Sequence, residues 1–267
     1  MITGSTRIYS TLGDPIHQVK APQLINDIFA RRFLDGVMVP MHILPKNLAQ
    51  AFDGLRAMEN FGGCVVTVPH KTVAPSLCDE ITPEAKQVGA VNIIRRTSEG
   101  KLIGGILDGI GFVEGLKREG IEPRHQSVYM AGAGGAANAI AYALAASGVK
   151  KIVISNRSPQ RALELITRLQ KDYPSIECHL GTTDPSGLDL VINCTSLGLN
   201  HADAFPCDVE KLSPDQIVAE IIMKPVETPW LKIAKQKGCR IQYGLPMLEC
   251  QILLMAEFMG LPQAITS

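Results

Sequence analysis

The sequence has no excess of charge of either sign. Its 26 Lys and Arg residues balance 26 Asp and Glu residues, which gives a formal net charge of +0. Proteins that bind nucleic acids gain most of their affinity by neutralising phosphates with a basic surface, and proteins that associate with membrane surfaces carry a similar basic signature. We therefore expect neither a nucleic-acid partner nor a membrane partner.

Targeting signals and paired cysteines are also missing. No basic stretch leads into an apolar run near Met1–Arg7, so no signal peptide is predicted. The uncharged stretch 126–149 is long enough to span a bilayer, but its glycine cluster and alanine-rich remainder fit a strand, a tight turn and a buried helix better. The seven cysteines include no Cys-x-x-Cys pair and are odd in number. We expect reduced cysteines, no metal site and a cytoplasmic protein.

Short apolar runs alternate with longer segments of helical spacing along the whole chain. The expected strands are Arg7–Leu12, Val37–His42, Cys64–Val68, Ala90–Ile94, Ser127–Ala131, Lys151–Ser155, Leu190–Asn193 and Ile217–Ile221. The expected helices are Pro22–Arg32, Asn47–Glu59, Gly109–Glu119, Gly135–Ala146, Ser158–Gln170, Pro229–Lys237 and Leu245–Met259. Such alternation implies crossover connections and mostly parallel sheets, so the predicted fold class is α/β, with a domain boundary around Asp108–Gly109.

A glycine-rich loop follows the apolar run Val128–Met130 and opens a helical segment. Its residues fit G-x-G-x-x-G/A with alanine in the last place, and the expected cofactor contacts are Gly132, Ala133, Gly134, Gly135 and Ala136. The first glycine permits the tight turn, the second lets the backbone approach a pyrophosphate, and the helix N-terminus favours the anion. An ordinary tight turn is the alternative, but the strand before and the helix after the loop favour dinucleotide binding.

The next expected strand ends without the carboxylate that an NAD-specific protein places on the ribose hydroxyls. Asn156, Arg157 and Ser158 follow it, and Arg161 lies one turn further on. A guanidinium and a hydroxyl suit a 2′-phosphate. Although exposed arginines are often only solvated, the missing acid together with two arginines favours NADP.

Together, these motifs and others resemble the shikimate dehydrogenase family. The matches run in order from about residue 8 to 255, over almost the whole chain. They comprise Gly13-Asp14-Pro15-Ile16, Val66–Lys71 (V-T-V-P-H-K), Gly89–Asn92 (G-A-V-N), Asp108–Gly111, the loop Gly132–Ala136, Asn156–Arg161 (N-R-S-P-Q-R), Asn193–Gly198 (N-C-T-S-L-G), Thr228-Pro229 and Gly244–Gln251.

The resemblance implies two α/β domains, namely an N-terminal α/β substrate domain plus a Rossmann-type NADP-binding domain. Residues 1–107 plus 245–267 would form the substrate-binding, catalytic domain, and residues 108–244 the NADP-binding domain. It further implies reversible hydride transfer between the nicotinamide and a secondary alcohol on a small cyclic hydroxy acid, by a monomer or a homodimer. Besides the residues above, it assigns cofactor contacts to Cys194, Thr195, Ser196, Ile221 and Gly244.

Lys71 and Asp108 occupy the catalytic positions of the family. Oxidation of an alcohol requires removal of the hydroxyl proton as the hydride leaves, and a Lys beside an Asp can hold the oxygen and move its proton. Without the resemblance, Lys71 would be interpreted as a helix-start residue and Asp108 as an N-cap. Thr67, Asn92 and Gln251 lie where the family binds its substrate, although both amides could equally be satisfied polar residues at the ends of elements.

The substrate side departs from the family pattern, because apolar residues replace hydrogen-bonding ones. Val19 and Ala21 stand where the family has two hydroxyls for the substrate carboxylate, and Val65, Ile93, Ile106, Leu107 and Met223 replace polar residues elsewhere. An unmet buried polar group costs about 1–3 kcal/mol. We therefore predict an altered pocket with weak shikimate activity or a less polar substrate. Lys20 could still attract a carboxylate or lie at the surface.

Two other functions remain open from the sequence. One is an NADP(H)-binding regulatory module with little catalysis, against which Lys71 and Asp108 count. The other is an NADP dehydrogenase of the methylenetetrahydrofolate type, which also keeps a catalytic Lys. An enzyme of that type would not be expected to have the N-R-S-x-x-R segment together with the G-x-x-M-x-x-x-Q segment, so this interpretation ranks lower.

Overall fold

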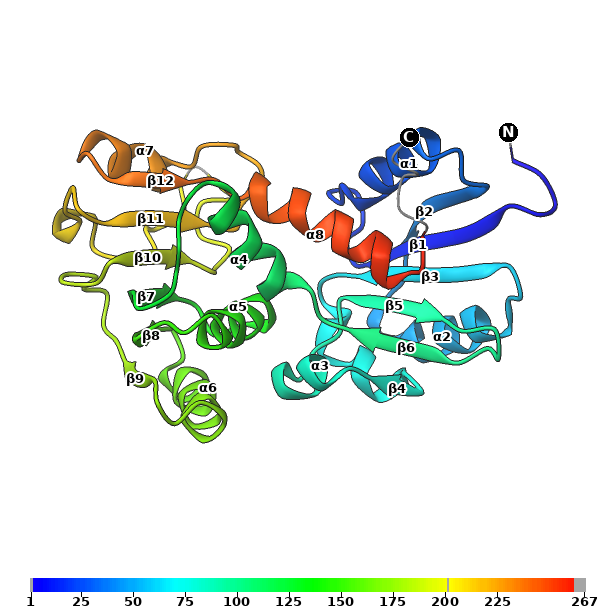
Figure 1. Cartoon of the computed structure of the whole chain (residues 1–267), viewed down its shortest axis with the longest axis horizontal. Coiled ribbons are helices and arrows are strands. Elements are labelled where there is room, and N and C mark those ends of the chain that lie inside the picture. The colour runs from blue at the N-terminus through cyan, green and yellow to red at the C-terminus, as the bar shows by residue number, and fades with distance from the viewer. Residues whose placement is uncertain (1, 201, 262–267) are drawn as a thin grey trace. The chain divides into compact units, whose positions relative to one another are not determined.

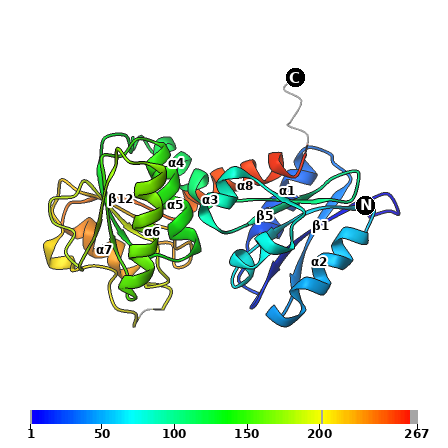
Figure 2. The same cartoon turned by 90° about the horizontal axis from the view of Figure 1, so that it is seen from below.

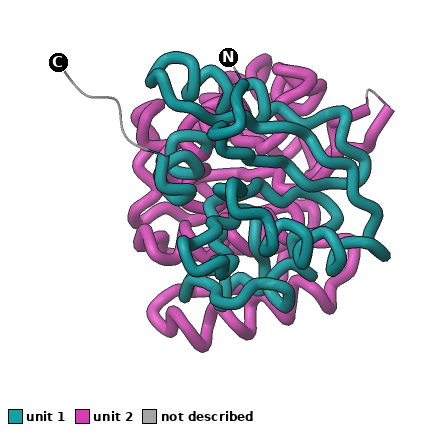
Figure 3. The backbone as a smooth tube through the Cα atoms, turned by 90° about the vertical axis from the view of Figure 1, so that its right-hand side faces the viewer, with its two compact units in different colours: residues 1–107, 252–267 teal, residues 108–251 magenta. Residues whose placement is uncertain are grey.

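Two units make up the computed structural model, which describes residues 2–200 and 202–261. Unit 1 contains residues 1–107 and 252–267, and unit 2 contains residues 108–251 (Figure 3). The first division follows Leu107, beside the expected boundary. The second falls inside α8 (Leu245–Phe258), whereas the sequence suggested a division ahead of this helix. The binding roles assigned to the two domains remain predictions.

Unit 1 is built on a six-stranded mixed sheet (Figure 1). Its order is β2-β1-β3-β5-β6-β4, where the strands are β1 (Arg7–Gly13), β2 (Gly36–His42), β3 (Phe61–Val66), β4 (Glu80–Ile81), β5 (Ile93–Arg96) and β6 (Leu102–Gly105). β1 pairs in parallel with β2 and β3, but β5 runs antiparallel to both β3 and β6. The expectation of mostly parallel pairing thus holds only partly here, and the strand expected at Ala90 begins at Ile93.

Helices cover both faces of this sheet, with α1 (Ala21–Arg31) on one side and α2 (Leu48–Ala57) on the other (Figure 2). α1 buries Ile25, Ile28 and Phe29 along one face, as its sequence spacing predicts. The short α3 (Pro83–Val88) was not predicted from the sequence. It is capped by the Thr82 hydroxyl, and the left-handed Gly89 ends it.

Unit 2 has a six-stranded, fully parallel sheet. Its strands are β7 (Ser127–Ala131), β8 (Lys151–Ser155), β9 (Glu177–Leu180), β10 (Leu190–Asn193), β11 (Ile217–Glu220) and β12 (Arg240–Gln242), in the order β12-β11-β10-β7-β8-β9. Numbered within the unit, this is the 3-2-1-4-5-6 order of the dinucleotide-binding fold. The Rossmann-type prediction is confirmed.

The helices of unit 2 are α4 (Asp108–Arg118), α5 (Gly135–Ala146), α6 (Pro159–Asp172), α7 (Pro229–Gln236) and most of α8. α5 and α6 lie on one side of the sheet and α7 on the other (Figure 2). α4 and α5 approach closely because Gly109 has no side chain, and a Cβ there would overlap the carbonyl of Ala139. None of the helices in the described ranges could cross a bilayer.

Candidate functional site

The glycine-rich loop lies at the carboxyl end of β7, the central strand of the unit 2 sheet. Gly132 has a φ of 112°, a left-handed value that favours glycine, and its N–H donates to the Ser155 carbonyl over 2.7 Å. A Cβ on Gly132 would lie 2.9 Å from the Cys194 carbonyl oxygen. Gly134 and Gly135 instead face open space, which leaves the N-terminus of α5 accessible to an anion.

Asn156 ties the glycine-rich loop to the end of β8. Its Oδ1 accepts from the N–H of Ala133 over 3.2 Å, and its Nδ2 donates to the Ser158 carbonyl over 2.8 Å. Ser158 caps α6 by position, but its hydroxyl makes no capping hydrogen bond. Arg157 and Arg161 are exposed, and neither forms an ion pair with a carboxylate of the described residues.

The segment after β10 lies beside the glycine-rich loop that follows β7. β7 and β10 are neighbours in the sheet, and the strand order reverses between them, which makes this position the topological switch point. The Cys194 N–H donates to the Ala131 carbonyl over 2.8 Å, which joins the ends of β10 and β7. Burial raises the pKa of the Cys194 thiol, so the residue is a neutral apolar group rather than a nucleophile. Ligands of this fold bind in the crevice at such a switch point, beyond the carboxyl ends of the strands.

Asn193 holds this segment in shape, a role that the sequence analysis did not assign. The side chain is fully buried, and its Oδ1 accepts from the Thr195 N–H over 3.0 Å and from the Thr195 hydroxyl over 2.6 Å. Its Nδ2 donates to the Leu197 carbonyl over 2.9 Å. The exposed Ser196 lies at the tip of this turn. The quoted N-C-T-S-L-G motif contained the signal, because Asn favours such local turns.

Glu220, another residue that was not predicted, closes the same end of the sheet. It ends β11, is fully buried, and accepts from the Thr228 hydroxyl over 2.9 Å. Burial raises its pKa from the ordinary 4.5 to about 7, while hydrogen bonds from Thr228 and Asn193 oppose the rise. Beyond it, the Gly244 backbone lies against that of Ile221 and Ile222: a Cβ on Gly244 would lie 2.9 Å from the Ile221 carbonyl carbon and would overlap the Ile222 carbonyl.

Asp108 and Gln251, which the sequence assigned to catalysis and substrate binding, meet in unit 2. Asp108 begins α4 and Gln251 lies in α8, and both side chains are buried. The Gln251 Nε2 donates to the Asp108 Oδ1 over 2.5 Å. Gly111 makes the close packing possible, since a Cβ there would lie 2.9 Å from that of Gln251. The amide therefore orients the carboxylate.

Lys71 and Thr67 lie just beyond the carboxyl end of β3 in unit 1. Thr67 bonds through its N–H to the Leu12 carbonyl over 2.9 Å and packs against Gly13, where a Cβ would lie 2.6 Å from the Thr67 methyl. Lys71 lies in a short 3₁₀ helix, His70–Thr72, and its side chain is half-buried. The buried His70 fixes this turn through its Nε2, 2.7 Å from the Ile43 carbonyl.

Asn92 lies beside the Lys71 turn, because the Val91 N–H donates to the Lys71 carbonyl over 2.8 Å. Its side chain is buried, and its Oδ1 accepts from the Leu107 N–H over 2.9 Å. The structure therefore brings Thr67, Lys71 and Asn92 to one end of the unit 1 sheet. The Asn92 side-chain oxygen is already used in the hydrogen bond from the Leu107 N–H, which stabilises the fold.

The positions where the family pattern fails are mostly buried. Ala21, Val65 and Ile106 are each less than a tenth exposed, and Val19 is half-buried ahead of α1. Val65 pairs with Thr11 on β1 and with Ile93 on β5. Met223, in unit 2, is half-buried after β11. The apolar replacements in unit 1 thus lie at the same end of its sheet as Thr67 and Asn92.

Comparison with known proteins identifies relatives over both units. A model of the shikimate dehydrogenase substrate binding domain matches residues 11–94, and a model of shikimate / quinate 5-dehydrogenase matches residues 117–198. A shikimate dehydrogenase (NADP(+)) from Bacillus cereus (strain AH187) is 36% identical over 255 residues, which cover 94% of this chain and 91% of that protein.

Solved structures agree with these matches. A shikimate 5-dehydrogenase from Listeria monocytogenes, in complex with shikimate and NAD, superposes with a TM-score of 0.91 at 29% identity, covering 99% of this chain and 95% of that one. The ligand-free 5-ketofructose reductase of Gluconobacter sp. strain CHM43 gives 0.85 at 32% identity, covering 94% and 92%. These relatives are enzymes, which supports the oxidoreductase interpretation over the regulatory module. The chain belongs to the shikimate dehydrogenase family of oxidoreductases.

Proposed function

We propose that this protein is an NADP-dependent oxidoreductase that interconverts a secondary alcohol and a ketone on a small polyhydroxylated molecule. The observation that carries the proposal is the cofactor end of unit 2. There, the dinucleotide-binding strand order and an open glycine loop occur together with two arginines that form no ion pair within residues 2–200 and 202–261. Family membership supports the same activity.

The residues after β8 fit NADP better than NAD. Residues 156–161, directly after β8, contain no carboxylate. Arg157 and Arg161 carry positive charge near the N-terminus of α6, where the Ser158 hydroxyl makes no capping hydrogen bond. A 2′-phosphate would accept charge-assisted hydrogen bonds from such groups. The accessible N-terminus of α5 suits the pyrophosphate.

Lys71 and Asp108 are proposed as the acid–base residues. Bound at the glycine loop, NADP would supply the hydride acceptor for the alcohol carbon and, in its reduced form, the hydride donor for the ketone. In the oxidation direction, Lys71 takes the hydroxyl proton and stabilises the developing negative charge on oxygen. Asp108, whose carboxylate Gln251 orients, is proposed to act with Lys71 in this proton transfer. Thr67 and Asn92 are proposed to bind the substrate hydroxyls.

Substrate recognition is proposed to differ from that of a shikimate enzyme. Val19 and Ala21 cannot donate to a carboxylate, and a carboxylate that leaves water without such donors loses affinity. A polyhydroxy ketone without a carboxylate, such as the substrate named in the 5-ketofructose reductase structure, would not incur this loss. This second candidate rests on the apolar residues at positions 19 and 21.

The test compares shikimate, quinate and 5-ketofructose as substrates of the purified protein. Formation or loss of the reduced nicotinamide is followed by absorbance, with NADP(H) and with NAD(H). We expect turnover with NADP(H) and a low kcat/KM for shikimate. No turnover of any substrate with either cofactor would contradict the oxidoreductase proposal.

A double variant tests the altered pocket separately. Val19→Ser with Ala21→Ser restores two donors, and we expect kcat/KM for shikimate to rise by about tenfold or more for each hydroxyl. The matched control is Ala30→Ser, which adds a hydroxyl at an exposed position of α1. Equal kcat/KM in the double variant and the control would overturn the altered-pocket proposal.

A further inference from the structure

A cavity of about 550 Å³ lies in unit 1, at the end of the sheet opposite to Thr67 and Lys71. Arg7, which lines it, is the first residue of β1, and Arg96 is the last residue of the antiparallel β5. Thr67 instead follows the carboxyl end of β3. β1 contains 7 residues, so its two ends lie roughly 20 Å apart. The volume is typical of a small-molecule site.

Positive charge dominates the polar part of the cavity. Arg7, Arg95 and Arg96 line it, and Asp35 is the one acid among the lining residues. Both Asp35 oxygens accept hydrogen bonds from hydroxyls, from Thr6 over 2.6 Å and from Ser5 over 2.8 Å. Neither Arg7 nor Arg95 forms an ion pair with a carboxylate in residues 2–200 or 202–261. Arg7 also donates to the Phe61 carbonyl over 3.3 Å, and the cavity has an excess of positive over negative charge.

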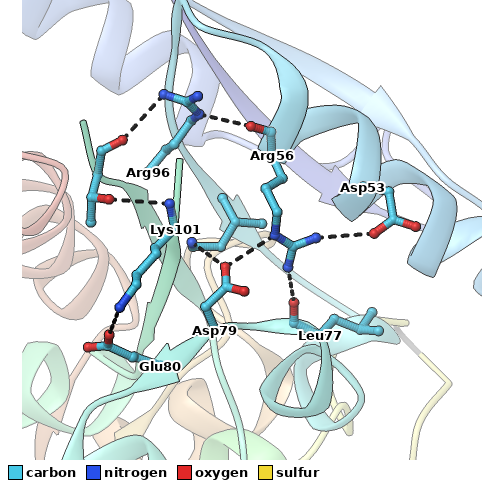
Figure 4. A network of polar contacts seen from close by, with 9 residues as sticks. Asp53, Arg56, Leu77, Asp79, Glu80, Arg96 and Lys101 are labelled. Atoms are coloured by element: carbon cyan, nitrogen blue, oxygen red, sulfur yellow. Dashed lines mark hydrogen bonds and ion pairs between the residues drawn. The ribbon is translucent and has the colours of Figure 1, made fainter. Parts of the chain in front are cut away.

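Arg96 is held in place by a polar network (Figure 4). Its side chain is only 4% exposed, although its ion-pair partner Glu59, at 3.0 Å, is 86% exposed. Its Nε donates to the Arg56 carbonyl over 3.1 Å, and the Arg56 guanidinium binds Asp79 and the Leu77 carbonyl. These contacts occupy the Arg96 guanidinium, so Arg7 and Arg95 are the lining arginines that can donate to a ligand.

Aromatic and aliphatic groups form the apolar part of the cavity. The Tyr9 and Phe29 rings lie 5.1 Å apart, and Met259 lines the cavity with them. Gly62 allows the Tyr9 ring to lie against the backbone, since a Cβ there would overlap it. Burial raises the pKa of Tyr9 while the charge of Arg7 opposes the rise, so the phenol is neutral at physiological pH and leaves that charge uncompensated.

We infer that this cavity is a second ligand site, which binds a small organic carboxylate with an aromatic or aliphatic ring. The Arg7 and Arg95 guanidiniums bind the carboxylate, and the ring packs on Tyr9, Phe29 and Met259. Arg95 also lies with its Cζ 6.0 Å from the centroid of the Phe258 ring, which limits its motion. The site does not depend on the proposed reaction, because it shares none of the residues proposed for cofactor or substrate.

Phenylacetate tests the site, because it joins one carboxylate to one ring. Binding is measured by isothermal titration calorimetry on the full chain at constant ionic strength, with saturating NADP present. We expect saturable binding with a Kd on the order of 1 mM, and binding of the uncharged phenylacetamide that is weaker by about tenfold or more. Arg7→Gln and Arg95→Gln, both at exposed positions, are each expected to weaken phenylacetate binding by about tenfold.

Arg124→Gln is the matched control, because it removes one exposed guanidinium from unit 2. It is expected to leave the phenylacetate Kd unchanged, and the melting temperatures of all variants confirm that they fold. Absence of saturable binding, equal binding of phenylacetamide, or unchanged binding in both cavity variants would overturn the inference. The titration is repeated without NADP, and binding that appears only in the absence of NADP would also overturn the inference, since the ligand would then lie in the cofactor site.

Discussion

At the scale of single residues, Lys71 has the most direct part in the proposed chemistry. It lies in the turn that His70 fixes beyond β3. We expect Lys71→Ala to lower kcat by about 100-fold or more, because the alcohol proton loses its acceptor. The dissociation constant for NADP, measured by fluorescence titration, is expected to stay the same. Lys86→Ala, at an exposed position of α3, is the control and should keep full activity.

Arg157 is the residue proposed to set the preference for NADP over NAD. We expect Arg157→Gln to raise the KM for NADP by about tenfold or more, because a charge-assisted contact to the 2′-phosphate is lost. The KM for NAD, which has no such phosphate, should not change. Arg124→Gln serves as the control. Equal effects of Arg157→Gln on both cofactors would contradict the proposed phosphate contact.

Glu220 makes the stability of the protein depend on pH. Its pKa is raised to about 7 in the folded chain from the ordinary 4.5, so the folded state holds this proton more tightly than the unfolded state. Its contribution is therefore most favourable below 4.5 and is lost as the pH rises through 7. The maximum loss is on the order of 3 kcal/mol, since one pKa unit corresponds to about 1.4 kcal/mol.

Urea unfolding of the wild type and of Glu220→Gln, across this pH range, measures the effect. The variant should lose the part of the pH dependence that Glu220 contributes, whereas Glu164→Gln, at an exposed position of α6, should keep it. Parallel pH profiles of the wild type and Glu220→Gln would show that the carboxyl has its ordinary pKa.

Among the elements, α4 and α5 approach each other over Gly109. A side chain at this position would overlap the Ala139 carbonyl, so we expect Gly109→Ala to lower the free energy of unfolding by about 1–3 kcal/mol. Gly54 is also a helical glycine, but nothing lies within 4 Å of its Cβ position. Gly54→Ala should instead gain about 0.5–1 kcal/mol. Thermal unfolding of both variants distinguishes the destabilisation caused by steric overlap at Gly109 from the stabilisation caused by higher helix propensity at Gly54.

The sequence predicted the parallel strands of unit 2 most accurately. The bounds of β7, β8 and β10 agree with the prediction, because each is an apolar run that ends at a loop. β4, β6, β9 and β12 were not predicted, because they have only 2 to 4 residues and none is a continuous run of large apolar side chains. The antiparallel direction of β5 could not be predicted either, because side-chain periodicity does not depend on strand direction.

The positions of the site residues were predictable from the sequence where they depend on a local backbone motif. The glycine loop and Asn156 lie at the strand ends that the strand–turn–helix pattern indicated. Asn193 and Glu220 were not predicted, because their roles depend on burial and on partners several residues away. The cavity at Arg7 and Arg96 was not predictable, since 89 positions separate residues that only the sheet register brings to one end.

At the scale of the whole molecule, the division into two units allows the unfolding of unit 2 to be followed by its own fluorescence signal. The chain contains a single tryptophan, and Trp230 is 2% exposed in the unit 2 core. NADP at about 100 times its Kd should stabilise the unit that binds it by about 2.7 kcal/mol. We therefore expect NADP to raise the midpoint of the thermal transition that tryptophan fluorescence reports. Arg157→Gln is the control: with NADP bound about tenfold more weakly, the same NADP concentration should stabilise unit 2 by only about 1.4 kcal/mol and shift the midpoint less.

The division inside α8 also sets an order for folding during synthesis. Unit 2 is complete once residue 251 has left the ribosome, but unit 1 still lacks residues 252 onward. Those residues include Met259 and Phe258, which pack against β3 at Gly63 and β6 at Gly105. The nascent unit 1 must therefore wait, with part of its apolar sheet uncovered, until translation of the chain has passed these positions. Chaperone contacts are expected to concentrate on this exposed face.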